Sequence, residues 1–118
     1  MKFFLDTYAL VEIIKGNLNY KMYVESDLFT SILNLYELFY NLLKEHGEDK
    51  SKLFFYQYYD IIIPLKDEHI FEASNLKLKN KKISYADALG YAISLKEGMK
   101  FLTGDKEFKG KDNVEFVK

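Results

Sequence analysis

The sequence predicts an α/β protein with a mainly parallel sheet that helices cover on both faces. Short apolar segments alternate with helical segments from one end of the chain to the other, and this alternation is typical of parallel sheets. The length of 118 residues suits one domain, and 48% apolar residues suffice for a hydrophobic core. Because no repeat, linker or low-complexity segment interrupts the alternation, residues 1–118 are expected to form a single domain.

The first three predicted elements are a strand, a helix and a second strand. Phe3–Leu5 is a short apolar run of the kind found in buried strands. In Tyr8–Lys15 the apolar residues recur at helical spacing, and Gly16 is expected to end that helix. Leu28–Thr30 is again short, so we expect the second strand there.

Two helices and a strand are expected in the middle of the chain. Ser31 is a favoured N-cap residue, and the long helix that it begins is predicted to end by Gly47. A second, strongly aromatic helix is predicted over Lys52–Tyr59. The β-branched run Ile61–Ile63 then predicts a strand, which Pro64 closes.

The last part of the chain predicts two helices followed by two strands. Asp67–Lys79 is a helix with several apolar residues and with lysines near its end. Residues 84–97 are predicted to form the next helix, which Gly98 ends. Phe101–Leu102 is a strand, and Val114–Val117 is expected to be a final strand at the edge of the sheet.

Composition excludes several classes of function. The chain has no cysteine, which rules out a disulfide framework, a thiolate zinc site and thiol catalysis. Acidic Asp6 and Glu12 interrupt the apolar N-terminus, and no segment approaches the roughly 20 apolar residues of a membrane span. We therefore expect a soluble, unprocessed protein without a membrane partner, located in a reducing cytoplasm.

Two acidic residues directly follow predicted strands. In an open parallel sheet, sites form beyond the carboxyl ends of the strands, where Asp6 and Asp105 stand. Each has a simpler interpretation, because Asp6 suits a helix N-cap and the Gly104–Asp105 pair suits a turn. Taken one at a time, the cap and the turn are the better interpretations.

Two further acids lie on predicted helices. Glu37 borders the apolar face of the long helix, where an ordinary surface acid would fit equally well. Asp87 follows Ser84 at the spacing of a capping box, in which the later side chain bonds back to a backbone amide. Ala88 and Ala92 are small enough to bring this helix close to the sheet. The apolar face expected for the long helix is Ile32, Leu35, Tyr36, Phe39, Leu42 and Leu43.

The four acids together predict a different chemistry. In a parallel sheet Asp6, Glu37, Asp87 and Asp105 can converge at one edge, where clustered carboxylates repel unless a cation lies between them. Their hard oxygen ligands select Mg²⁺ or Mn²⁺. Such an ion generates hydroxide and stabilises a phosphoryl transition state, so we predict phosphodiester hydrolysis.

Four segments resemble one known family. FLDTYAL, LNLYELFYNLL, SYADALGYAIS and FLTGDKEF occur in this order over nearly the whole chain. They resemble the signature of PIN domains, and they are most similar to the short VapC-type ribonuclease toxins and their archaeal relatives. The resemblance implies a three-layer α/β/α sandwich with a parallel sheet. It also implies a Mg²⁺- or Mn²⁺-dependent endoribonuclease, usually a homodimer, with RNA as substrate and an antitoxin as partner.

The resemblance also implies roles for individual residues. Asp6, Glu37, Asp87 and Asp105 match the four metal-ligating and catalytic acids in chain order, and Thr103 matches a hydroxyl that the family often keeps beside the site. On this basis Asp87 is expected to be a ligand, with the capping left to Ser84 alone. A bond from Asp87 back to Ser84 would count against that role.

Every basic residue of the chain is a lysine. The chain therefore cannot bind phosphate through the bidentate hydrogen bonds that arginine makes. The four acids together carry −4, so that with a net charge of −1 the remainder carries +3. Substrate phosphates could be held by Lys77, Lys79, Lys81 and Lys82, although such a run is more often a solvated helix end.

The other conspicuous side chains have structural interpretations. The aromatic helix around Phe54 to Tyr59 is expected to be core or dimer surface, and not a base-stacking platform. His46 and His69 lack metal-ligand spacing and are taken as structural or exposed. Two other functions stay open. One is a PIN-like scaffold or partner-binding module that cleaves nothing. The other, less favoured, is a haloacid-dehalogenase-like phosphatase, which would want a second Asp where Tyr8 stands.

Overall fold

The protein is built around a four-stranded parallel sheet with strand order β2-β1-β3-β4. The structure is a computed structural model that describes residues 1–118. The strands are β1 (Lys2–Leu5), β2 (Asp27–Phe29), β3 (Lys100–Thr103) and β4 (Val114–Phe116). The α-helices are α1 (Thr7–Lys15), α2 (Ile32–Gln57), α3 (Asp67–Lys79) and α4 (Tyr85–Glu97). Short 3-10 helices are η1 (Leu18–Tyr23), η2 (Tyr59–Ile61) and η3 (Lys106–Phe108).

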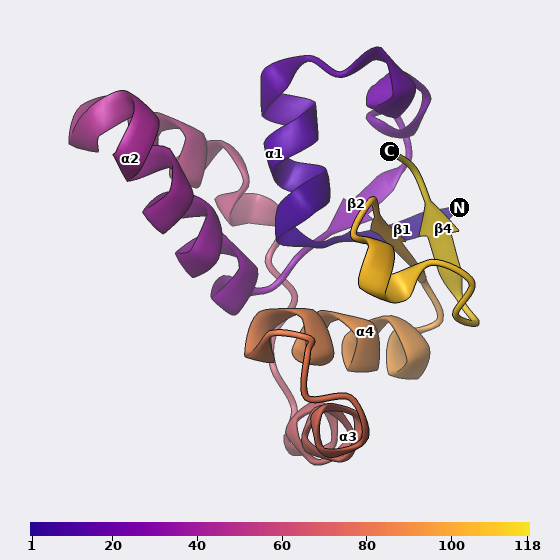
Figure 1. The fold of residues 1–118 in the computed structure, drawn as a ribbon. Helices are drawn as coiled ribbons and strands as arrows, with labels where there is room; N and C mark the ends of the chain where they lie inside the picture. Colours follow the sequence, from indigo (N-terminus) through magenta and orange to yellow (C-terminus); the bar gives the residue numbers. More distant parts are fainter.

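Alternating side chains divide the sheet into two apolar faces. Phe3 and Leu5 of β1 pack with α1, η1 and α2, and Leu102 of β3 joins them. Phe4 and Phe101 point to the opposite face and pack with residues of α4 and α3. Figure 1 shows the resulting layers, with α1 and α2 on one side of the sheet and α4, then α3, on the other. The predicted three-layer α/β/α architecture is therefore confirmed.

Helix α4 lies unusually close to the sheet at Gly90. A Cβ atom on this residue would come 2.4 Å from the ring of Phe4 and 3.1 Å from that of Phe101. Glycine is therefore needed for the approach of the two backbones, in addition to the small residues Ala88 and Ala92, which are both buried. This close approach sets the position of the first turn of α4 against the ends of the central strands.

Two sequence predictions about secondary structure are wrong in part. Ile61–Ile63 is not a strand: η2 ends at Ile61, and Ile62 makes only an isolated parallel bridge to Thr30. The two helices predicted on either side of Gly47 form one helical segment that bends at this residue, whose φ of 76° is not helical. Positive φ is readily adopted by glycine, which allows the bend without strain.

The predicted apolar face of α2 is also corrected. Leu35 and Leu42 are buried as expected, but the same face includes Leu38 and the polar Asn34. Four of the expected core residues are not buried: Ile32, Tyr36 and Leu43 are exposed, and Phe39 is half-buried. The pattern of apolar residues predicted the wrong buried face of α2, because the buried face includes Asn34, a polar residue with hydrogen-bond partners.

No helix of the structure combines the length and the apolar composition that a membrane span requires.

Candidate functional site

Asp6 stands at the junction of β1 and α1 and is almost completely buried. Its Oδ1 accepts a hydrogen bond of 2.8 Å from the backbone N–H of Ala9, so it caps α1. Its Oδ2 accepts a hydrogen bond from the hydroxyl of Thr103 at the end of neighbouring β3. The cap interpretation and the site interpretation of Asp6 are thus compatible, because one carboxylate has lone pairs for both.

Thr103 connects two of the predicted acids. While its hydroxyl donates to Asp6, the same oxygen accepts the backbone N–H of Asp105 at 3.0 Å. The carboxylate of Asp105 accepts the N–H of Glu107 at 3.0 Å, so the expected turn is present at the start of η3. The fully buried Thr103 therefore fixes the ends of β1 and β3 relative to each other.

Asp87 lies in the first turn of α4, as the sequence predicts. The hydroxyl of Ser84 accepts the backbone N–H of Asp87 at 3.0 Å and caps the helix. No hydrogen bond runs from the Asp87 carboxylate to the backbone amide of Ser84, so the capping box is not closed. The Asp87 side chain is consequently available to the space beyond the helix start.

Glu37 is held in place by a network of polar residues that the sequence analysis missed. The hydroxyl of Thr7 donates to Glu37 Oε1 at 2.6 Å, and the side-chain amide of Asn34 donates to Thr7 Oγ1 at 3.3 Å. Asn34 is itself anchored by the hydroxyl of Ser31, which donates to Asn34 Oδ1 at 2.7 Å. A signal was present in the sequence, because Thr7 directly follows Asp6 and Asn34 is a polar residue on an apolar helix face.

All four predicted acids line one cleft of about 580 Å³ at the carboxyl edge of the sheet. Its walls come from the whole length of α1, from the first half of α2, from the start of α4 and from the segment after β3. The lining residues are Asp6, Thr7, Tyr8, Val11, Glu12, Lys15, Glu37, Tyr40, Asn41, Ser84, Asp87 and Asp105. The convergence that the strand order makes possible is therefore present.

Burial and mutual repulsion raise the pKa values of two of these acids. Loss of hydration, followed by the charge of Asp87, raises the pKa of Asp6 well above its ordinary value, against the opposing hydrogen bond from Thr103. Loss of hydration, followed by the charges of Glu37 and Asp105, raises the pKa of Asp87 to about 7, against the opposing hydrogen bond with the side chain of Ser84. The four acids thus interact electrostatically as one group.

This group fits a divalent cation. A cation beside carboxylates that burial and like charge destabilise would relieve both effects. No three of the four acids bring oxygens within 4.8 Å of one another, which is compatible with Mg²⁺ because this ion usually keeps several water ligands and binds through one or two carboxylates. Asp6 and Asp87 are the two acids whose carboxylate forms a cation in the cleft would stabilise most, since burial and like charge raise their pKa values.

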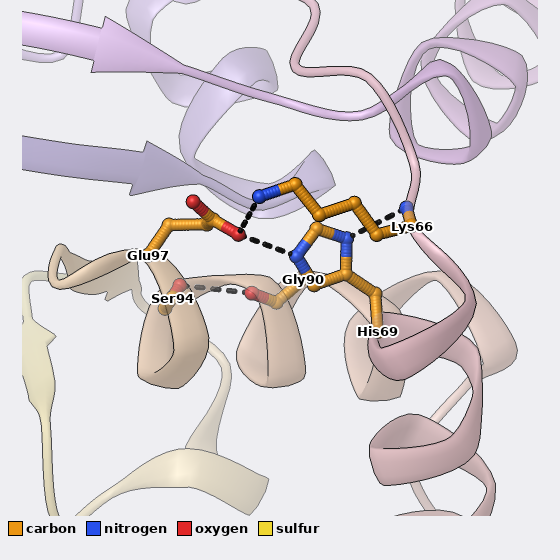
Figure 2. A network of polar contacts seen from close by, with 5 residues as sticks. All are labelled: Lys66, His69, Gly90, Ser94 and Glu97. Atoms are coloured by element: carbon orange, nitrogen blue, oxygen red, sulfur yellow. Dashed lines mark hydrogen bonds and ion pairs between the residues drawn. The ribbon is translucent and has the colours of Figure 1, made fainter.

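The tightest group of possible metal ligands lies elsewhere, between α3 and α4. One atom each of Glu68, His69 and Glu97 lie within 4.8 Å of one another. Figure 2 shows that His69 Nδ1 instead accepts the backbone N–H of Lys66 at 3.1 Å, while Nε2 lies 2.8 Å from Glu97 Oε2. With its Nδ1 lone pair used, neutral His69 carries its proton on Nε2 and has no lone pair for a metal. The expected structural role of His69 fits this network.

The lysines predicted as substrate contacts do not line the acidic cleft. Lys77 donates to the carbonyl oxygen of Ile83 at 2.8 Å and lies over the ring of Tyr85, so it stabilises the turn before α4. Lys77 and Lys81 line a second, mainly apolar cavity of about 510 Å³. The lysine that does line the acidic cleft is Lys15, at the end of α1, which the sequence analysis did not single out.

Several solved structures with the same architecture are toxin–antitoxin or VapBC complexes. One is a toxin–antitoxin complex from Klebsiella pneumoniae, with 20% identity, a TM-score of 0.74 and coverage of 95% of this chain and 94% of that chain. VapBC2 from Rickettsia felis, bound to a DNA fragment from its promoter, has 17% identity and a TM-score of 0.73, and the match covers both chains in full. VapBC-1 from nontypeable Haemophilus influenzae has 15% identity and a TM-score of 0.75, and the match covers 98% of this chain and 96% of that chain.

At identities this low, the TM-scores show a common fold and nothing more specific. No curated protein matches the chain in sequence. A family model for the PIN domain matches residues 3–114, which is nearly the whole chain and includes all four acids of the cleft. The chain therefore belongs to the PIN domain family.

Proposed function

We propose that the protein is a divalent-metal-dependent endoribonuclease and the toxin of a toxin–antitoxin pair. The observation that carries the proposal is the cleft in which Asp6, Glu37, Asp87 and Asp105 interact through their charges. Membership of the PIN family supports nuclease chemistry. The VapBC complexes among the structures of the same fold support the toxin role and an antitoxin partner.

Mg²⁺ or Mn²⁺ is the proposed cofactor, with the four acids as its ligands directly or through water. When bound, such an ion supplies Lewis-acid stabilisation of phosphoryl charge and an activated water. Two of the acids are oriented by neighbouring hydrogen-bond donors. Thr103 and the N–H of Ala9 keep Asp6 in a fixed orientation, and Thr7 does the same for Glu37. Orientation by such neighbouring groups is what keeps metal ligands effective.

Asp87 is suited to metal binding. Its pKa is about 7 without a metal, because burial and the charges of Glu37 and Asp105 disfavour the carboxylate. Binding of a cation beside it would lower that pKa and release the proton. Homodimerisation, which the family resemblance implies, belongs to the same proposal, as does the cytoplasmic location expected from the absence of cysteine.

The proposal is tested by cleavage of mixed-sequence RNA oligonucleotides with Mn²⁺ or Mg²⁺. We expect cleavage that EDTA abolishes and that falls by about a hundredfold or more in Asp6→Asn and Asp87→Asn, since removal of one group that stabilises transition-state charge costs on the order of 10²–10³ in rate. Asp49→Asn, which removes an exposed acid outside the cleft, is the matched control.

Three outcomes would separate the alternatives. Absence of metal-dependent cleavage in the parent protein supports the silent scaffold. Equal activity of Asp6→Asn, Asp87→Asn and the parent contradicts the assignment of the site. Turnover of small phosphomonoesters with phosphorylation of Asp6 supports a phosphatase. The toxin role is tested by expression in bacterial cells, where growth arrest by the parent and normal growth with Asp87→Asn are expected.

A further inference from the structure

Tyr40 occupies a position at the acidic cleft that the proposed chemistry does not explain. It lies on α2 one turn after Glu37, and residues three apart share a face of a helix. It lines the cleft together with the four acids and with Asn41. Its side chain is 59% exposed, so it belongs to the rim of the cleft and not to the core.

The ring of Tyr40 has no aromatic neighbour. The exposed rings farther along α2 contact one another, as Tyr56 does with Phe55 and Tyr59. Tyr40 takes part in no such pair, and Lys44 Nζ lies over one face of its ring, 4.7 Å from the centroid. Because the residue is 59% exposed, the ring still offers flat apolar surface to a ligand.

Two lysines lie near this ring or line the same cleft. Lys44 follows Tyr40 by one helical turn. Lys15 lines the cleft from the end of α1, the helix beside α2, with a side chain 62% exposed and its Nζ 3.7 Å from Glu12 (Figure 1). The acidic floor of the cleft thus has an aromatic ring with positive charges at its rim, which is the combination that binds single-stranded nucleic acid through stacking and phosphate contacts.

The cleft does not suit a protein segment equally well. Of its twelve lining residues only Tyr8, Val11 and Tyr40 are apolar or aromatic, whereas peptide grooves are lined by apolar side chains. The second cavity, beside α3 and α4, has that apolar character. The charges and the ring at the acidic cleft therefore favour a nucleic acid over a peptide.

We infer that Tyr40 stacks on an unpaired base of the RNA substrate, with Lys15 and Lys44 contacting the flanking phosphates. The inference rests on the proposed ribonuclease function and adds a base subsite to it. In duplex RNA the base faces are stacked on one another and cannot reach Tyr40. Because the ring touches a base and not the reacting phosphate, its effect is on binding and on KM.

Binding is measured by fluorescence anisotropy of a labelled single-stranded RNA oligonucleotide in an Asp87→Asn background, which prevents cleavage. We expect Tyr40→Ala to raise Kd by about tenfold or more, because stacking of one base is worth about 1–3 kcal/mol. Tyr40→Phe should stay within about twofold of the parent, since the ring is kept. Tyr56→Ala, which removes an equally exposed ring outside the cleft, should leave Kd unchanged.

The inference predicts that a duplex of the same sequence binds with a Kd that Tyr40→Ala does not change. Equal binding of the single strand by Tyr40→Ala and the parent would overturn it, as would equal losses in Tyr40→Phe and Tyr40→Ala. Loss of a protein partner with RNA binding intact would overturn it too. Cleavage by the wild-type protein is followed in parallel: if cleavage occurs while Tyr40→Ala binds normally, only this inference fails, and if no RNA is cleaved, the proposed function fails.

Discussion

Thr103 at the end of β3 donates its hydroxyl hydrogen bond to Asp6 at the end of β1. The two residues are 97 positions apart in the sequence, and their strands are direct neighbours in the sheet. The same hydroxyl oxygen accepts the backbone N–H of Asp105. One buried hydroxyl thus aligns two acids of the cleft, which makes Thr103 the residue through which the sheet fixes the geometry of the site.

Replacing this hydroxyl should weaken both the fold and the site. Thr103→Val keeps the shape but leaves the Asp105 N–H and Asp6 Oδ2 without this partner, so we expect a loss of about 1–3 kcal/mol in the free energy of unfolding. The pKa of Asp6 should rise further, because the hydrogen bond from Thr103 lowers it. Chemical denaturation measures the first effect. Thr103→Ser keeps the hydroxyl and should retain most of the stability; an equal loss in both variants would contradict the role of the hydrogen bond.

The stability of the metal-free protein should fall as pH rises from about 4 to about 7. The pKa of Asp87 is about 7 in the folded protein, against 3.8 for a solvent-exposed aspartate side chain, so within this interval the folded state binds a proton that the unfolded state has lost. The slope is up to about 1.4 kcal/mol per pH unit for one such group. Asp6, whose pKa is also raised, acts in the same direction.

The pH dependence is measured by urea denaturation in EDTA at several pH values. Asp87→Asn cannot ionise, so it should lose much of the slope and be more stable than the parent at pH 7. Asp49→Asn should behave as the parent. A parent protein whose stability is flat or increases over this interval would show that Asp87 is not held in the desolvated, repelling environment described above.

Gly90 should not tolerate a side chain. Alanine at an exposed helix position would stabilise α4 by about 1 kcal/mol, but here its Cβ would lie 2.4 Å from the ring of Phe4. We expect Gly90→Ala to lower the free energy of unfolding by about 1–3 kcal/mol, as overpacking usually does. Lys96→Ala, on the exposed side of the same helix, is the control and should have little effect. A stabilised Gly90→Ala protein would disprove the close approach of α4 to the sheet.

The contact between Glu97 and His69 should stabilise the fold only where Glu97 is ionised. Hydrogen bonds from His69 and then Lys66 lower the pKa of Glu97. Its contribution is therefore complete above the unfolded pKa and is lost as pH falls through the lower folded value. Glu97→Gln should cost about 1 kcal/mol at pH 7 and less near pH 3, as measured by urea denaturation. A cost that is the same at both pH values would contradict the ionic part of this contact.

Much of the fold could be predicted from the sequence because local and long-range signals agree. Phe3–Leu5 and Phe101–Leu102 are strands whose alternating side chains do fill two cores. The run Ile61–Ile63 misled because β-branched residues favour strands only where a partner strand is available. Here the segment pairs with the chain only through one isolated bridge, between Ile62 and Thr30, the residue that follows β2.

The acids of the candidate site could be predicted from the sequence, but the polar residues that hold Glu37 in place could not. Strand order brings Asp6 and Asp105 together from general topology, and the family pattern adds Glu37 and Asp87. Thr7 and Asn34 could not be recognised in the same way, because their roles depend on which helix face is buried. The lysines of residues 77–82 do not line the cleft, and Lys77 donates to a nearby carbonyl group, which fits the alternative of an ordinary helix end.

The central claim is that the four acids hold a divalent metal, and a crystal structure of the protein grown with Mn²⁺ tests it most directly. Anomalous scattering locates Mn²⁺ independently of any assumption about its ligands. We expect a peak in the cleft beside Asp6 and Asp87, which should be lost in Asp87→Asn and kept in Asp49→Asn. No peak in the cleft, or a peak only at Glu68, His69 and Glu97, would contradict the account.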